Sequence, residues 1–527
     1  MKNYEKTTRM NSGIKRNYEG GIGYEMTLKE KITEFFSLGL LNGTFYQDEV
    51  DVLNDARELF EEALDNCSEF ATKAAIYGNN VNSLKLVPTI WLVYLSTLED
   101  KTLFNVAFDR IIRNPKMLYD FMEMSRKSGI REGLGRSTKK TMNNWLNNHL
   151  NEYQVSRNKS KLKDIVKVTR PYNNDEEFQN YMRYISKDEL TFERAIALKS
   201  VINELLNDNV DEEVISLINK HRLQLDELKH STMNLSQENK EELYYEMYKG
   251  LNYNALILNL VALERVFAVE TEKEIKNSIY GQFKQEKIIK SDLPKKIIDM
   301  VVGRINDLDL YRKSNMLPFG LFNAYNMVST NEFKDAISRV IETMSRETFN
   351  IDKDISLLVG VDTSASMGSM VSNTLSAMDI ATLFGAMIRK SHLNSSIYAV
   401  ATTIEGIELD NEQTVFEMAK NIADADVGYG TYFEQIMKHY NGEKYIILIT
   451  DNMYADDLEK AWLKAKKPKG AKLIVWQLVA YQTKASNDKS VIHLAGYSDR
   501  LLALVKNIIE GKAGQIEEIE KISLARS

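Results

Sequence analysis

The stretch that most constrains the fold of this chain covers residues 357–368. It opens with five residues that are apolar or glycine, and Asp362, Ser364 and Ser366 follow at once. An apolar run without charge predicts a strand that is buried on both faces, as in a parallel sheet. Ligands of open parallel sheets bind beyond the carboxyl ends of the strands, so these polar residues stand where a binding site is expected.

The spacing of the three residues resembles the Asp-x-Ser-x-Ser pattern of von Willebrand factor A domains, where it forms a metal-ion-dependent adhesion site. The chemistry of the side chains agrees with this resemblance. A divalent ion such as Mg²⁺ prefers about six oxygen ligands at roughly 2.0–2.1 Å and keeps several of its waters. Asp362 would supply charge at the strand end, and Ser364 and Ser366 would supply neutral oxygens. Taken alone, a serine-rich loop after a strand also fits a plain strand–loop–helix turn.

Two later segments resemble the remaining parts of the same site. Thr431 follows a glycine-bracketed loop at residues 428–430, just before an expected helix, and Asp451 follows a second apolar strand at residues 445–450. The A-domain family takes its other ligands from a Thr and an Asp in these contexts and in this order. The resemblance therefore implies that Mg²⁺ or Mn²⁺ is bound by Asp362, Ser364, Ser366, Thr431 and Asp451.

The periodicity of the sequence changes near residue 355. From residue 26 to about residue 349 the apolar spacing predicts helix after helix without a fixed-period repeat, which favours an irregular HEAT-like α-solenoid. After this point strands alternate with helices, which predicts a doubly wound, mostly parallel sheet. The strands are expected at residues 355–361, 396–401, 444–450, 472–479 and 491–494.

These patterns predict a multidomain chain with an α module and an α/β domain. Residues 1–23 are polar and mildly basic and are expected to form a flexible arm. Residues 24–350 are assigned to the helical module and residues 355–527 to the α/β domain. No apolar run approaches the ~20 residues of a membrane span, so no membrane partner is expected. A single cysteine, Cys67, allows no internal disulfide, which favours a cytoplasmic location.

The charge of the chain is distributed unevenly. The formal net charge of −7 argues by itself against a nucleic-acid partner. Residues 126–170, however, contain twelve basic and three acidic side chains, so this segment carries +9 and the remainder −16. Such segregation predicts a surface for a polyanion. A solvated basic segment without a partner is the alternative interpretation.

The order of the two parts, together with short motifs, resembles the Ro autoantigen family of ring-shaped RNA-binding proteins. In that family a helical TROVE module precedes an A domain. The resemblance runs from about residue 20 to residue 509, and the family's aromatic–His pair after Arg157-Asn158 has no clear counterpart here. Motifs that carry it are Gly43-Thr44-Phe45-Tyr46, Gly135-Arg136, Lys139-Lys140, Arg157-Asn158, His221-Arg222-Leu223, Leu317-Pro318-Phe319 and Thr450-Asp451-Asn452.

The resemblance implies a monomeric, bacterial or phage-type member with two kinds of RNA ligand. A small structured noncoding RNA of the Y RNA type would bind the outer basic surface, and single-stranded 3′ ends of misfolded RNAs would enter the cavity of the ring. RNA quality control or processing, with an exoribonuclease as partner, is the role that the family implies. The residues expected to contact RNA are Arg126, Lys127, Arg131, Arg136, Lys139, Lys140, Arg157, Lys159, Lys163 and Arg170.

Catalytic motifs are scarce in this sequence. There is no phosphate-binding Gly-x-x-x-x-Gly-Lys loop, no His-Glu-x-x-His motif and no cysteine cluster, so the chain is not expected to be an enzyme. Two other functions stay open. The metal site would hold a partner's carboxylate in a protein-adhesion scaffold, or Asp362 and Asp451 would hold the metal of a nuclease.

Overall fold

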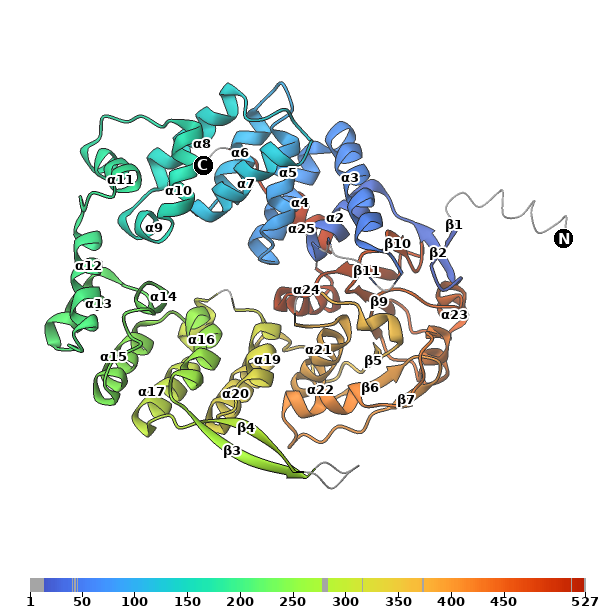
Figure 1. The fold of residues 1–527 in the computed structure, drawn as a ribbon. Helices are drawn as coiled ribbons and strands as arrows, with labels where there is room; N and C mark the ends of the chain where they lie inside the picture. The colour runs from blue at the N-terminus through green and yellow to red at the C-terminus, as the bar shows by residue number, and fades with distance from the viewer. Residues whose placement is uncertain are drawn as a thin grey trace. The chain divides into compact units, whose positions relative to one another are not determined.

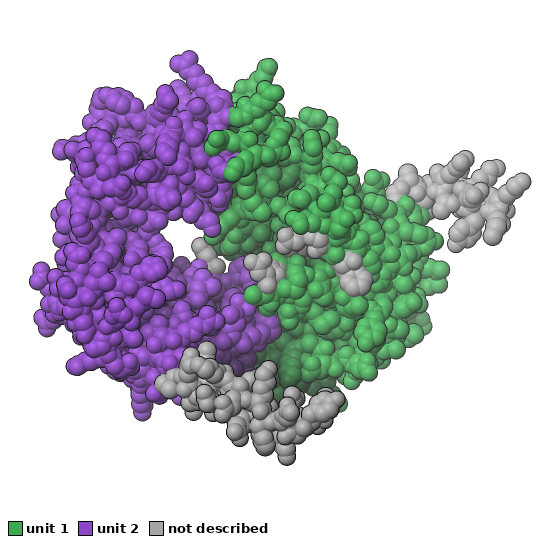
Figure 2. Space-filling view, viewed as in Figure 1, with its two compact units in different colours: residues 1–113, 124–133, 341–527 green, residues 114–123, 134–340 purple. Residues whose placement is uncertain are grey.

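The computed structural model describes residues 14–525, except residues 40, 42–43, 45, 277–282, 315, 372–373 and 513. Gly43 and Phe45 of the expected aromatic motif therefore lie outside the described residues, as do residues 1–13 of the expected arm. Contacts divide the chain into two compact units (Figure 2). The first comprises residues 1–113, 124–133 and 341–527, and the second comprises residues 114–123 and 134–340.

The α/β part of the first unit is built on a six-stranded sheet with the order β11-β9-β8-β5-β6-β7 (Figure 1). All five expected strands are present and pair in parallel, which confirms the expected fold class. The short strand β7 (Ile404–Gly406) was not expected and pairs antiparallel with β6 at the sheet edge. The parallel strands are β5 (Leu357–Asp362), β6 (Ser395–Val400), β8 (Tyr445–Thr450), β9 (Lys472–Gln477) and β11 (Val491–Ala495).

Helices cover both faces of this sheet. A Cβ on Gly385 of α21 (Ala377–Ser391) would contact Val361, whereas a Cβ on Gly360 would contact Ile436 of η2 (Phe433–Lys438). Because neighbouring residues of a strand point to opposite faces, α21 and η2 lie on opposite sides of β5. The helix α22 (Val415–Ala423) packs with α21, and α23 (Leu458–Lys464) packs with η2. Strands β5 and β8 are buried along their whole length, as their uninterrupted apolar sequences predict.

The N-terminal helices pack against the α/β domain within the first unit. Lys484 bonds to Glu30 at 2.7 Å, and Tyr497 donates to the carbonyl of Leu38 at 3.0 Å. The amide of Gln515 donates to the Ser37 hydroxyl at 2.9 Å. These pairs explain why the compact units do not coincide with residues 24–350 and 355–527. The N-terminal helices of this unit are α2 (Leu28–Leu38), α3 (Glu49–Asn66), α4 (Ser68–Val81), α5 (Leu86–Leu95) and α6 (Thr102–Ile111). The C-terminal helices of the unit are α24 (Asp499–Ile509) and α25 (Gln515–Glu520).

The segment before α2 is not a free arm where it is described. Strands β1 (Ile14–Arg16) and β2 (Ile22–Glu25) form a hairpin, and β2 pairs with β10 (Thr483–Lys484) to give a three-stranded sheet. The N–H of Gly21 donates to the Tyr454 carbonyl at 3.1 Å. A Cβ at position 21 would lie 2.1 Å from that oxygen, so glycine allows the hairpin to approach this closely.

Where it is described, the second unit is helical apart from one hairpin. Strands β3 (Ala268–Lys276) and β4 (Phe283–Ser291) pair antiparallel, which differs from the expectation of helix after helix. Within the described residues no helix is long and apolar enough to cross a membrane. Helices α7 (Pro115–Lys127) and α20 (Asn331–Thr348) contribute residues to both units. The others are α8 (Arg136–His149), α9 (Glu152–Arg157), α10 (Lys159–Thr169), α11 (Glu176–Lys187), α12 (Glu193–Leu206), α13 (Glu212–His221), α14 (Leu225–Leu228), α15 (Gln237–Gly250), α16 (Tyr253–Val266), α17 (Lys295–Ile305), α18 (Leu308–Arg312) and α19 (Pro318–Met327).

Candidate metal site and basic helices

The two carboxylates of the predicted metal site lie at the same edge of the sheet. Asp362 is the last residue of β5 and Asp451 follows β8, and these strands are parallel neighbours. Both side chains are fully buried. The N–H of Ser364 donates to Asp362 Oδ1 at 3.0 Å and the Thr450 hydroxyl donates to Asp362 Oδ2 at 2.7 Å. Asp451 Oδ1 accepts from the N–H of Met453 at 3.0 Å.

Three loops bring the predicted hydroxyl ligands to this edge. The hydroxyls of Ser364 and Ser366 are 3.2 Å apart. The N–H of Ala365 donates to the Tyr429 carbonyl at 3.0 Å, which ties the glycine-bracketed loop to the loop after β5. The carbonyl of Thr431 in turn accepts from Ala455, in the loop after β8, at 2.9 Å. The geometry therefore places all five predicted ligands around one point of the sheet edge.

Two oxygens of the site are buried without a protein partner. Thr431 Oγ1 and Asp451 Oδ2 have no hydrogen-bond partner among the described residues. A buried polar atom without a partner is costly, and hard divalent cations take carboxylate and hydroxyl oxygens. The described residues contain no group of three or more His, Cys, Asp and Glu side chains suited to a metal, so hydroxyls are needed to complete a ligand set. The residues present fit Mg²⁺ or Mn²⁺.

The electrostatics of the site also favour a cation. Burial raises the pKa of Asp362 to about 6. Burial, and then the negative charge of Asp362, raises the pKa of Asp451 well above its usual range. Two carboxylates that are buried together oppose each other's ionisation, and a divalent cation between them would remove that opposition.

The basic helix α8 of the second unit has a charged face toward solvent and an apolar face that is buried, as expected. On α8, Arg136 and Lys140 are exposed and Lys139 is half-buried, whereas Met142 and Trp145 are buried. His149, which the sequence placed on the apolar side, is exposed at the end of α8 and lies against the Trp145 ring at a centroid distance of 5.2 Å. The amide of Asn143 donates to the Thr169 carbonyl at 3.1 Å and holds α8 against the end of α10.

Three of the residues predicted to contact RNA bond through their charged head groups to other residues of the protein. Arg131 donates to the Gly133 carbonyl at 2.6 Å and to the Ser96 hydroxyl, and burial lowers the pKa of its guanidinium. Arg157 is paired with Asp226 and donates to the Tyr153 hydroxyl at 2.9 Å. Lys159 lies 2.5 Å from Asp188 and 3.9 Å from the centre of the Tyr184 ring.

The remaining predicted residues lie mostly on the surface. Arg126 and Lys127 are exposed and belong, like Arg131, to the first unit, whereas all the other predicted residues belong to the second. Among the predicted residues of the second unit, those that are exposed are Arg136, Lys140, Lys163 and Arg170.

A cavity of 960 Å³ in the second unit was not expected from the sequence. Its lining includes Tyr153 of α9, His221 and Arg222 at the end of α13, and the buried Arg194. Arg194 makes two bonds to Glu227, at 2.7 and 2.9 Å, and donates to the His221 carbonyl at 3.0 Å. The motif at residues 221–223 was the one signal for this region, and no pattern in the sequence pointed to Arg194.

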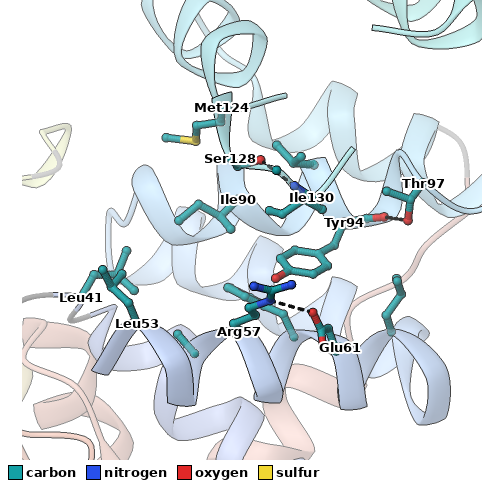
Figure 3. Close-up of a pocket in the computed structure, with 15 residues that line it drawn as sticks. Leu41, Leu53, Arg57, Glu61, Ile90, Tyr94, Thr97, Met124, Ser128 and Ile130 are labelled. Carbon is teal, nitrogen blue, oxygen red and sulfur yellow. Dashed lines mark hydrogen bonds and ion pairs between the residues drawn. The ribbon is translucent and has the colours of Figure 1, made fainter. Parts of the chain in front are cut away.

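A second cavity, of 540 Å³, lies in the first unit between α3 and α5 (Figure 3). Its lining is mostly apolar, with Phe60 and Ile90 among the residues that surround it. The only ion pair drawn in it joins Arg57 to Glu61 at 3.0 Å. None of the predicted metal or RNA residues lines this cavity.

Comparisons with known proteins identify the fold. No family model matches the sequence, and no curated protein matches it. Among solved structures, the crystal structure of the Deinococcus radiodurans RO (RSR) protein matches with a TM-score of 0.60 and 14% sequence identity. The match covers 92% of this chain and 100% of that one. The chain therefore has the fold of that protein.

Proposed function

We propose that this chain, which has the fold of a Ro protein, is an RNA-binding protein of the Ro family. The observation that carries the proposal is the basic surface of α8–α10 on a helical module with this fold. Arg136, Lys140, Lys163 and Arg170 present exposed cations on these helices or directly after them. Exposed Lys and Arg side chains that neutralise phosphates release counterions, which supplies affinity without reading sequence.

The finer parts of the proposal follow from the family resemblance. A small structured noncoding RNA of the Y RNA type is the ligand of the basic surface, and single-stranded 3′ ends of misfolded RNAs are the second ligand. The role is RNA quality control or processing in the cytoplasm, with an exoribonuclease as protein partner. The chain acts as a monomer.

The metal site would serve this function by binding a divalent ion, and it would not catalyse a reaction. Asp362, Ser364, Ser366, Thr431 and Asp451 would hold Mg²⁺ or Mn²⁺, whose charge would join the loops after β5 and β8. A catalytic role would also need a base or nucleophile placed beside the metal, and the sequence offers no recognisable set of this kind.

A protein-adhesion scaffold is the second candidate function. The observation that favours it is the pair of buried, unpartnered oxygens on Thr431 and Asp451, which fits a metal site of the adhesion type. In that case the metal would bind a partner's carboxylate and RNA binding would be incidental.

Sequencing the RNA that co-purifies with the full chain tests the proposed function. Enrichment of one small structured RNA over total RNA, with binding that weakens as salt rises, is the expected result. Protein that purifies without RNA and binds a small structured RNA no better than an acidic control protein does would leave the adhesion scaffold as the better interpretation. RNA cleavage that needs Mg²⁺ and stops in Asp362→Ala would point to a nuclease instead.

A further inference from the structure

The turn between β1 and β2 carries a carboxylate, Glu19, and is tied to the loop that follows the predicted ligand Asp451. The turn is fixed internally, because the Asn17 side chain accepts from Gly21 N–H at 2.9 Å. It is also fixed to the loop after β8, where Gly21 donates to the Tyr454 carbonyl at 3.1 Å and the Tyr454 hydroxyl donates to the Ile22 carbonyl at 3.0 Å. Tyr454 is three residues after the predicted ligand Asp451, so the turn is bonded to the same loop that begins with this ligand.

Tyr46 bonds directly to Glu19. Its hydroxyl donates to Glu19 Oε1 at 2.6 Å, and burial, together with the charges of Glu19 and Asp451, raises the pKa of this hydroxyl. The Tyr46 ring stacks on Tyr18 at a centroid distance of 5.5 Å and lies edge-on to Tyr481 at 5.9 Å. The ring centroids of Tyr18 and Tyr481 are themselves 5.6 Å apart, so two neighbouring rings hold the Tyr46 side chain in place.

The predicted metal site is shielded from solvent. The five predicted ligands are all buried, with exposed fractions of at most 2%. An adhesion site that is ready for a partner must let an external carboxylate reach its metal, and side chains this deeply buried do not allow that. Burial is the main reason that the pKa values of Asp362 and Asp451 are raised, and the negative charge of Glu19 raises both further.

We propose that Glu19, held by Tyr46, is the chain's own substitute for an external acidic ligand. Its carboxylate faces the bound divalent ion from outside the set of five ligands and keeps the carboxylate of a partner protein out of the site. The metal then fastens the N-terminal hairpin to the α/β domain and does not serve adhesion. This inference rests on the metal binding that forms part of the proposed function.

Mn²⁺ titration of the full chain, with free Mn²⁺ followed by electron paramagnetic resonance, tests the inference. Glu19→Gln should weaken Mn²⁺ binding on the order of tenfold, because a negative charge close to the cation is lost. Added acetate should restore part of the affinity in Glu19→Gln but leave the wild type unchanged. Tyr46→Phe should give an intermediate loss, which supplies a second variant if Glu19→Gln does not fold. The matched control is Glu25→Gln, an exposed residue of the same hairpin, which should bind Mn²⁺ as the wild type does.

Three outcomes separate this inference from the metal site itself. Wild-type affinity and no acetate response in Glu19→Gln would overturn the role of Glu19 while leaving the metal site intact. Acetate that strengthens Mn²⁺ binding by the wild type would also overturn it, because the site would then be open. Asp362→Ala protein that binds Mn²⁺ as the wild type does would overturn the metal site, and the inference with it.

Discussion

The hydroxyl of Thr450 donates to Asp362 Oδ2 at 2.7 Å and so joins the ends of the neighbouring strands β8 and β5. The same hydroxyl accepts from the N–H of Asn452 at 2.8 Å. With the bond from Ser364 N–H, Asp362 is oriented by two donors, one at the end of β8 and one in the loop after β5. Hydrogen bonds of this kind fix the direction in which a carboxylate meets a cation.

Thr450→Val should weaken both the fold and the metal site. The variant keeps the shape of the side chain but leaves the buried Asp362 carboxylate without one donor, which costs about 1–3 kcal/mol of unfolding free energy. Mn²⁺ affinity should fall about 10–100-fold, as is usual when a bond to a ligating carboxylate is lost. Urea unfolding and Mn²⁺ titration measure the two effects. Thr450→Ser, which keeps the hydroxyl, is the matched control, and equal results for the two variants would contradict the prediction.

Asp362→Ala should abolish stabilisation of the chain by Mn²⁺. A ligand that binds only the native state raises its stability by mass action, so a variant that cannot bind the ion should melt at the same temperature with and without it. RNA affinity should stay at the wild-type value, because the basic helices belong to the other compact unit. Thermal melts with and without Mn²⁺, beside an RNA-binding assay, provide the measurement. A melting shift equal to that of the wild type would count against this metal site.

The sequence predicted the elements that meet at the sheet edge but not what covers them. Strands β5 and β8 are buried on both faces, so their apolar runs and terminal carboxylates could be recognised directly. Neither Glu19 nor Tyr46 carried an apolar-run signal of this kind, and the hairpin that bears Glu19 is held by residues far along the chain. Tyr454, for example, bonds to Ile22 across 432 positions.

Two other differences also have physical causes. The hairpin β3–β4 lacks the alternation of apolar and polar residues by which strands are recognised, so the sequence around it suggested only helices. The grouping of the N-terminal helices with the α/β domain depends on polar pairs such as Lys484 with Glu30, 454 positions apart. For the basic helices, charge could be counted in advance, but the acidic partners of Arg157 and Lys159 could not be assigned.

Glu34→Gln should change how stability depends on pH. Glu34 of α2 is fully buried, and burial raises its pKa to about 8 from an ordinary value of 4.5. The folded protein therefore keeps a proton that the unfolded chain releases, so stability should fall as pH rises from about 4.5 to about 8 and level off above that. The variant lacks this contribution and should be more stable than the wild type at the upper end of that range by on the order of a few kcal/mol. Urea unfolding at pH values below, within and above the range measures it, and parallel pH curves for both proteins would contradict it.

Arg194→Met should destabilise the second unit strongly. Arg194 and Glu227 are almost completely buried, with exposed side-chain fractions of 3% and 10%, and their two bonds leave the carboxylate fully paired. Removing one partner of a buried pair costs about 3–5 kcal/mol, because the other charge is left without compensation. Arg194→Met/Glu227→Gln is the control, since it removes that charge as well and should recover part of the loss. Equal denaturation midpoints for the single variant and the wild type would refute the prediction.

Replacing Arg136, Lys139 and Lys140 together by Ala should reduce RNA affinity through loss of phosphate contacts. Each lost contact should flatten the slope of log affinity against log salt by about 0.7–0.9, and the loss should be similar for different RNA sequences. Stability should change little, because substitutions of surface charges usually stay within about 0.5 kcal/mol. The measurement is a salt titration of RNA binding beside a thermal melt. Ala at the exposed Lys464, Lys466 and Lys469 of the α/β domain removes the same number of charges and is the matched control. A stable triple variant with wild-type slope and affinity would remove α8 from the RNA surface, whereas a lowered melting temperature with an unchanged slope would assign these residues a structural role.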